Sequence, residues 1–303
     1  TPPAMSVSER LRYKQWAQWA VEIVWKALEW EEHSSHETDY RLRPKVRMEL
    51  DEASATQLVF VYNEIEKRFA GDSAAYFSAF GKVRDRYQGK PTLRVASIDI
   101  GGGTTDMVIT CYTTQSAGTT NILIPNQEFR EGFNVAGDDI VKSVIEGHLI
   151  PQLSAHLSQF DPSINRETLL RRIGRNVVDL SERDRNLRAQ LGQQVLHPLA
   201  LHVLESMEKL NSQDMESYAN FPVHARTVLE RGPGVDPDVL GFIRQFSMHG
   251  ALNEVDLLDW TASLDLAAVC DSIKSTMAPY LENLSEVVKA YDCDYLVISG
   301  RPS

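Results

Sequence analysis

The chain has few cysteines and no long apolar run. Its three cysteines stand far apart, with no spacing typical of metal ligands, at Cys111, Cys270 and Cys293. Scattered thiols in odd number are typical of a reducing compartment, so we expect a cytoplasmic protein. No stretch approaches the roughly 18 consecutive apolar residues of a transmembrane helix, and no signal-peptide pattern opens the chain.

Clusters of basic residues are missing as well. Among 303 residues, 31 Lys and Arg are outnumbered by 42 Asp and Glu, which gives a formal net charge of −11. An acidic chain without a Lys/Arg-rich stretch is poorly suited to bind nucleic acid or an anionic membrane, so we expect neither partner. With 43% hydrophobic and 24% charged residues, the composition is typical of a soluble globular protein of one or two domains.

The first 44 residues predict an N-terminal helical segment, residues 1–44. Ser6 and Glu9 form a capping-box signature, and we expect the helix to continue to about Glu32. Its tryptophans predict packing in a core or an interface rather than ligand binding; they are Trp16, Trp19, Trp25 and Trp30. The pair His33 and His36 is spaced for a metal, but without a third ligand nearby it indicates a loop.

The next hundred residues mix strand-like and helix-like patterns. A short strand is predicted at residues 45–50 and a helix from Leu58 to Phe69. Strand-like runs at 93–100 and 104–112 flank three glycines, which predicts a β-hairpin.

Apolar spacing near 3.6 residues then dominates the chain. Residues 140–260 predict a mostly helical insertion, with breaks near Asp161 and Gly192. A last helix is predicted over 264–291, and it leads into a strand at 295–298. The order of elements indicates an α/β fold.

The sequence Asp99-Ile-Gly-Gly-Gly-Thr-Thr-Asp106 carries the clearest chemical signal. Glycines at a hairpin turn tolerate positive φ angles and leave no Cβ to block a ligand, and successive backbone N–H groups can converge on an anion. Thr104 and Thr105 add hydroxyl donors. Asp99 places a carboxylate where it would face Mg²⁺ and its waters beside a phosphate.

Other glycine motifs do not fit these residues. The dinucleotide fingerprint, counted from Gly101 and Gly103, requires a third glycine where the chain has Asp106. A P-loop requires Gly-Lys-Ser/Thr at the start of a helix, which this chain lacks. A glycine-rich hairpin without a ligand is the remaining alternative, and the flanking threonines and aspartates argue against it.

Residues 97–111 resemble the second phosphate motif of the actin, Hsp70 and bacterial cell-shape ATPases. Residues 51–56 resemble the connecting segment of that superfamily, although Ala53 stands where proline is usual. Residues 137–139 resemble its glycine-acidic turn, and residues 295–300 its adenosine-binding strand and turn. The resemblance implies an actin/Hsp70-like (ribonuclease H-like) ATPase domain with a mostly helical inserted lobe. The domain would comprise residues 45–139 and 261–303, and the lobe residues 140–260.

The same resemblance implies ATP and Mg²⁺ as ligands. The β- and γ-phosphates would be held by Gly101, Gly102, Gly103, Thr104 and Thr105. Asp99 would bind Mg²⁺ through water, and Glu52 would orient the metal shell or the attacking water, which makes these two the expected catalytic residues. The ribose, α-phosphate and adenine side would be formed by Gly137, Asp138, Gly300 and Arg301.

The superfamily's first phosphate loop has no counterpart in this sequence. Because the chain begins at Thr1 and ends at Ser303, we expect a segment of a longer bacterial protein, with ATP between this domain and an upstream one. The expected activity is an ATPase that couples ATP to domain movement and requires that missing domain or another protein as a partner. A nucleotide-dependent scaffold, a polymerising actin-like protein and a small-molecule phosphotransferase remain alternatives.

A narrower resemblance involves three separate parts of the chain. The sequence DIGGGTTDMVIT, the tryptophan-rich helix before it and the closing SGRPS resemble the bacterial SrfB-type virulence factors. This resemblance implies the same fold and names no mechanism.

Overall fold

The computed structural model describes residues 6–28, 44–48, 52–117, 120–174, 181–210, 218–247 and 250–300. The chain divides into two compact units. The first is formed by Thr1–Ala136 with Glu282–Pro302, and the second by Gly137–Leu281. Each unit is described by itself.

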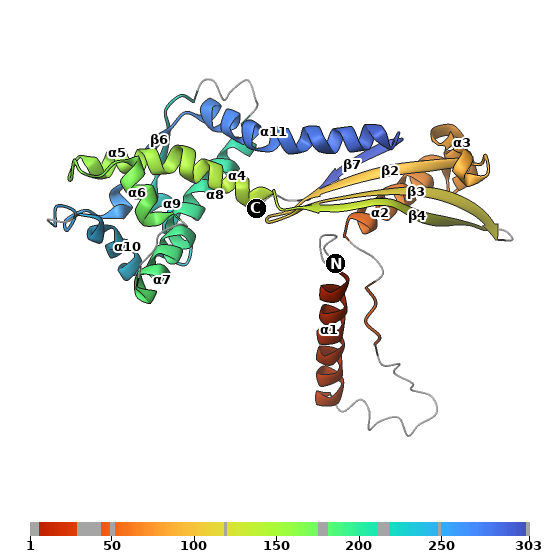
Figure 1. The fold of residues 1–303 in the computed structure, drawn as a ribbon, viewed down its shortest axis with the longest axis horizontal. Coiled ribbons are helices and arrows are strands. Elements are labelled where there is room, and N and C mark those ends of the chain that lie inside the picture. Colours follow the sequence, from red (N-terminus) through yellow and green to blue (C-terminus); the bar gives the residue numbers. More distant parts are fainter. Residues whose placement is uncertain are drawn as a thin grey trace. The chain divides into compact units, whose positions relative to one another are not determined.

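A five-stranded sheet organises the first unit (Figure 1). Strands β2 (Pro91–Ile100), β3 (Thr105–Ala117) and β4 (Thr120–Phe133) form an antiparallel meander. On the other side of β2, strand β7 (Tyr295–Ser299) pairs in parallel and the short β1 (Lys82–Val83) pairs antiparallel. The predicted hairpin, and the predicted strand near residues 295–298 in the same sheet, are confirmed.

Helices pack on both faces of this sheet. One face is covered by α2 (Glu52–Phe69) and α3 (Ser73–Phe80), whose Val61, Ile65 and Phe77 pack with residues of β2 and β3. The other face packs against the last turns of α11 (Leu266–Ala290) through a second cluster of buried residues. Among the members of that cluster are Ala96, Ile98, Met107, Ile109 and Leu284.

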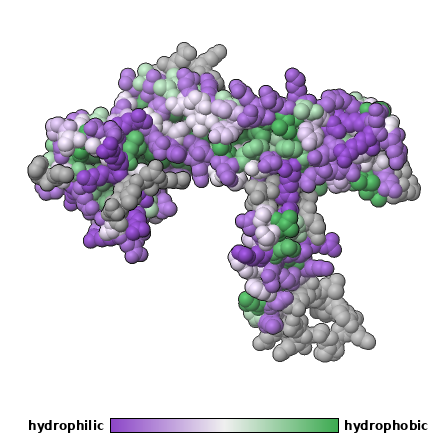
Figure 2. Space-filling model, in the orientation of Figure 1, coloured by the Kyte–Doolittle hydropathy of each residue, from purple (hydrophilic) through white to green (hydrophobic). Residues whose placement is uncertain are grey.

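The N-terminal helix α1 (Val7–Ala27) begins as predicted. The Ser6 side chain accepts a hydrogen bond from the Glu9 N–H, and the Glu9 carboxylate accepts from the Ser6 N–H at 2.8 Å. Its tryptophans differ in their exposure. Trp25 is buried, but Trp16 and Trp19 are 56% and 50% exposed, and Figure 2 shows hydrophobic residues on the surface of this helix.

The segment after α1 corrects another expectation. Residues 44–48 form no regular structure, so the strand predicted at 45–50 is wrong over the part that the structure describes. Trp30, His33 and His36 lie outside the described residues.

The second unit is mainly helical, with one two-stranded antiparallel ribbon. Two π-helical turns, η2 (Ile145–Leu149) and η3 (Gly192–Leu196), continue directly from helices. The helix therefore does not break at Gly192, contrary to the prediction. The α-helices are α4 (Gly137–Val144), α5 (Ile150–Ser158), α6 (Arg166–Ile173), α7 (Glu182–Leu191), α8 (His197–Glu208), α9 (Ala225–Leu229), α10 (Pro237–Phe242) and the start of α11, and the strands are β5 (Phe221–His224) and β6 (Thr261–Leu264).

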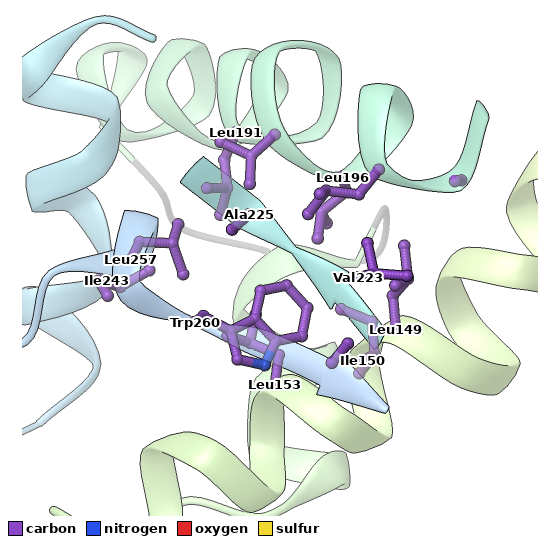
Figure 3. Packing of buried hydrophobic residues seen from close by; sticks show 14 of the residues in the cluster. Leu149, Ile150, Leu153, Leu191, Leu196, Val223, Ala225, Ile243, Leu257 and Trp260 are labelled. Carbon is purple, nitrogen blue, oxygen red and sulfur yellow. The ribbon is translucent and has the colours of Figure 1, made fainter. Parts of the chain in front are cut away.

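One apolar core holds the second unit together. Trp260 lies at its centre beside Leu153, Ile150 and Leu257 (Figure 3). Burying an indole of this size contributes several kcal/mol by removing apolar area from water, at about 25 cal/mol per Å².

Short helical turns of 3₁₀ type complete the described elements: η1 (Asp85–Tyr87) in the first unit, η5 (Ile243–Phe246) and η6 (Leu257–Asp259) in the second. Within the described ranges, none of the helices combines the length and the apolar character needed to cross a bilayer.

Candidate functional site

The glycine turn closes the hairpin between β2 and β3. Ile100 pairs with Thr105, and the Gly101 N–H donates to the Thr104 carbonyl at 2.9 Å. Gly103 is exposed, while Gly101 and Gly102 are half-buried. Gly101 does not use the left-handed backbone region, and its Cβ would meet the Thr104 carbonyl oxygen at 3.2 Å. Glycine therefore suits this position because the Thr104 carbonyl oxygen approaches it closely, and not because the backbone needs a positive φ.

Gly300, which directly follows β7, lies at the same place. Its φ is +103°, and a Cβ on it would lie 2.2 Å from the carbonyl oxygen of Ile100. Asp99 pairs with Ser299 in the parallel ladder between β2 and β7. Because parallel strands end at one edge of a sheet, the glycine turn and Gly300 lie at the carboxyl end of these strands, where α/β sheets commonly bind ligands.

Two carboxylates face each other beside the turn. Asp99 pairs with Asp106 across the hairpin, so both side chains project from the same face of the sheet. Asp99 is half-buried, and Asp106 is 5% exposed. Facing like charges are unfavourable in a sheet. Arg130 of β4 pairs with Val108 and therefore lies on the same face as these carboxylates.

Helix α2 begins at this same end of the sheet. The Ser97 hydroxyl donates to the Ala53 carbonyl at 3.3 Å, whereas Val61 and Ile65, further along α2, pack near Leu93. The helix therefore runs antiparallel to β2 and starts beside its carboxyl end. Glu52 is its first residue, and the side chain of Glu52 lies outside the described part of the structure.

A buried amide joins α2 to both strands of the hairpin. Gln57 is fully buried, and its Nε2 lies 3.1 Å from the Val95 carbonyl oxygen and 2.9 Å from both the Ser97 hydroxyl and the Val108 carbonyl oxygen. Its Oε1 accepts from the Tyr112 hydroxyl at 3.1 Å. Sequence reasoning missed this network. The available signal was a lone amide within the buried i, i+4 row of α2, which is Ala53, Gln57, Val61 and Ile65.

The two threonines of the motif differ in their surroundings. Thr105 is buried, and its hydroxyl donates to the Val135 carbonyl at 2.5 Å. A hydroxyl has one proton to donate, so in this arrangement that of Thr105 ties the hairpin to the end of β4. Thr104 is half-buried in the turn itself.

The other expected residues fall elsewhere. Gly137 and Asp138 form the start of α4, in the second unit, where the carboxylate complements the positive end of the helix. Arg301 lies outside the described residues. Within the first unit, the structure brings together Asp99, the turn at 101–104, Gly300 and the first turn of α2.

The donor set at this end suits Mg²⁺ bound largely through water. Among the residues that the structure describes, no group of three or more His, Cys, Asp or Glu side chains could hold a metal ion. Mg²⁺ at nucleotide sites keeps several waters and needs only one or two carboxylates beside the phosphates. Asp99, half-buried beside the turn, would be one such carboxylate.

These features define a mixed α/β protein in which an antiparallel meander, one parallel strand and packed helices place a glycine turn and Gly300 at one edge of the sheet. The chain belongs to the SrfB family, because the family model described as "Virulence factor SrfB" matches it over residues 1–303. No curated protein matches the chain.

Proposed function

We propose that this chain supplies one wall of an ATP–Mg²⁺ site of the actin/Hsp70 type, and that the protein couples ATP binding or hydrolysis to domain movement. The observation that carries the proposal is the contact of Gly300 with Ile100. It sets the two turns that resemble phosphate and adenosine motifs at one edge of the sheet.

The turn residues would bind phosphate through their backbone. Gly102 and Gly103 offer N–H groups without side chains in the way, and the Thr104 hydroxyl adds a donor. The Gly101 N–H already donates to the Thr104 carbonyl, so Gly101 would shape the turn and let the phosphate approach closely. The Thr105 hydroxyl already donates to the Val135 carbonyl, so it would stabilise the turn and not bind phosphate. In such sites catalysis is mainly positioning and charge stabilisation.

The carboxylates of Asp99 and Glu52 would act on the metal ion and the attacking water. Asp99 would hold Mg²⁺ through water, and the bound ion would neutralise charge on the phosphates. Glu52, at the start of α2, would orient the metal shell or the attacking water. Gly300, at the end of β7, would lie on the adenosine side of the nucleotide.

An opposing wall from an upstream segment or another protein is part of the proposal. With one wall, water on the open side screens the charges and leaves phosphate oxygens without protein donors. Each lost phosphate contact costs on the order of 1.5–3 kcal/mol, so losing two or three changes a micromolar site to a millimolar one.

Calorimetry with Mg-ATP tests the proposal on two proteins: the 303-residue chain and a chain extended upstream in its natural sequence. We expect weak binding by the first and tight binding with hydrolysis by the second. In the extended chain, Gly102→Val should abolish binding, whereas the control Gly241→Val, at a helical glycine with nothing within 4 Å of its Cβ position, should not. Tight binding by the shorter chain, or none by the extended one, would overturn the proposal.

A nucleotide-dependent scaffold is the second candidate, and exposed apolar side chains favour it. Besides Trp16 and Trp19 on α1, strand β7 exposes Leu296 and Ile298, the latter by 66%. Exposed aromatic and aliphatic residues of this size are common in protein interfaces. If ATP promotes assembly of the extended chain in sedimentation without measurable phosphate release, the scaffold function is favoured over the ATPase.

A further inference from the structure

We propose that Gln57 and Ser97 are positioning residues that hold the first turn of α2, and with it Glu52, beside Asp99. The role of this placement in ATP binding rests on the proposed function. The placement itself rests on contacts within the first unit.

The contacts form one chain from helix to hairpin. The Ala53 carbonyl accepts from the Ser97 hydroxyl, which in turn accepts from Gln57 Nε2. The same amide nitrogen reaches the carbonyls of Val95 on β2 and Val108 on β3. One side chain thereby contacts both strands that carry the glycine turn.

The network specifies the position of the helix along the strand. All its polar atoms are buried, and a buried polar group left without its partner is costly. Sliding α2 by one residue along β2 would remove the amide from these acceptors at once, whereas the apolar contacts of Val61 and Ile65 would tolerate a small shift because they are not directional.

The position of the helix matters because both expected catalytic residues adjoin these contacts. Asp99 lies two residues beyond Ser97 on the same face of β2, about 7 Å further along the strand. Glu52 immediately precedes Ala53. The hydrogen bond between Ser97 and Ala53 therefore sets how closely the start of α2 approaches the Asp99 carboxylate.

Two substitutions that each delete one buried hydroxyl provide a matched test. Ser97→Ala removes the connection to Ala53, and Tyr112→Phe removes the connection to Gln57 Oε1 on the far side of the network. The readout is hydrogen exchange at the amides of Thr56, Gln57 and Leu58, which bond back to the first turn of an α-helix.

We expect Ser97→Ala to speed exchange at these amides about five- to tenfold, the effect of one lost hydrogen bond. Exchange at residues 64–69, near the other end of α2, should stay unchanged. Tyr112→Phe leaves Gln57 Nε2 and the bond between Ser97 and Ala53 in place, so it should speed exchange at the first-turn amides much less. Equal rates in both variants, or faster exchange along the whole helix, would overturn the inference.

A second measurement tests the functional part on the upstream-extended chain. The ratio of ATP affinities with and without Mg²⁺ should fall at least about threefold in Ser97→Ala and stay near wild type in Tyr112→Phe. A purely structural role for Ser97 would lower stability and leave this ratio intact, and that result would also overturn the inference. Failure of the wild-type protein to bind ATP would refute the proposed function, and the exchange experiment alone would then decide the positioning.

Discussion

The two ends of the sheet in the first unit differ in how their charged side chains are paired. At the amino end of β2, Arg84 bonds both oxygens of Asp294, at 2.9 and 3.0 Å. The Asp294 side chain is only 2% exposed. Next to it, Arg94 Nε lies 2.7 Å from a Glu128 carboxylate oxygen. Carboxylates and guanidinium groups are thus matched in pairs, as burial requires.

Tyr87 completes the arrangement at the amino end. Its hydroxyl donates to Glu128 at 2.7 Å. Burial and this hydrogen bond raise the pKa of Tyr87 above its ordinary value, so the phenol remains a donor at neutral pH. Each buried carboxylate at this end therefore has its partners within the protein.

At the carboxyl end, two carboxylates face each other across the hairpin, and Arg130 of β4 lies on the same face of the sheet. Asp99 faces Asp106, and among the described residues no lysine or arginine forms an ion pair with Asp99. Matched pairs at one end serve stability, whereas a carboxylate without an ion pair, such as Asp99 at the other end, is typical of sites that bind ligands. This difference favours the glycine end as the site of function.

The largest expected effect is at the amino end. Arg84→Leu leaves the buried Asp294 carboxylate without its bidentate partner, which should reduce the free energy of unfolding by about 3–5 kcal/mol. Lys82→Ala is the control. Lys82 Nζ lies 3.5 Å from the same carboxylate but is half-exposed, so its loss should be much smaller in urea denaturation. Equal losses would show that the burial of the Arg84 pair is unimportant.

Gly300→Ala tests the closure of the carboxyl end. A Cβ would overlap the Ile100 backbone, and the positive φ adds strain, so we expect a loss of about 2–4 kcal/mol in the free energy of unfolding. Gly89→Ala separates the two causes. Gly89 also has a positive φ, +68°, but nothing lies within 4 Å of its Cβ position. Gly89→Ala should therefore reduce the free energy of unfolding by only about 1–2 kcal/mol. Identical losses would contradict the close contact between the two strand ends.

Asp99→Asn should change stability and binding in opposite directions. Without metal, removing one of two facing carboxylates should raise the free energy of unfolding by up to about 1 kcal/mol. In the upstream-extended chain, the same change should weaken Mg-ATP binding. Asp271→Asn, an exposed carboxylate on α11, should alter neither in thermal denaturation and calorimetry. If Asp99→Asn destabilised the metal-free protein, the carboxyl end would need a structural explanation.

Much of the first unit could be predicted from the sequence because its signals are local. The capping box of Ser6 and Glu9 begins α1, and glycines between two β-branched runs form the hairpin. The β-branched residues near Leu58 do not prevent a helix, because their charged neighbours place one apolar face inward. Missing from the prediction is α3, a short helix capped by Asp72.

Other features depend on contacts between distant segments. No local pattern shows that Gln57 reaches Val95 and Val108, since these residues meet only after folding. The ribbon of β5 and β6 joins residues some forty positions apart. Strand β5 lies inside the stretch predicted as mostly helical, and β6 directly follows that stretch. The sequence predicts a break at Gly192, but a π-helical turn absorbs this glycine within a continuous helix, since tertiary packing outweighs the roughly 1 kcal/mol cost of glycine.

The smallest expected effect concerns stability at acid pH. Histidines of the second unit contribute a pH dependence that wild type and variants share. Burial lowers the pKa of His148, His156 and His202. Protonation then favours the unfolded state, so their contribution is lost as pH falls below the ordinary value of 6.5. Any variant of the first unit carries the same background, which cancels when the variant is compared with wild type.

Asp292→Asn is the last test, at the exposed edge of the amino end. Lys82 Nζ lies 2.6 Å from Asp292, and this hydrogen bond holds the pKa of Asp292 below its ordinary value of 3.8. A carboxyl group with a lowered folded-state pKa stabilises the protein above its unfolded value and loses that contribution as pH falls through the folded-state pKa. The difference in stability between wild type and Asp292→Asn should therefore be present at pH 7 and shrink toward roughly pH 3. Because the pair is exposed, added salt should reduce the difference at pH 7, whereas it should leave the loss caused by Arg84→Leu nearly unchanged. Urea denaturation at both pH values, with and without salt, measures this, and a salt-insensitive difference at Asp292 would remove the distinction between exposed and buried pairs at this end of the sheet.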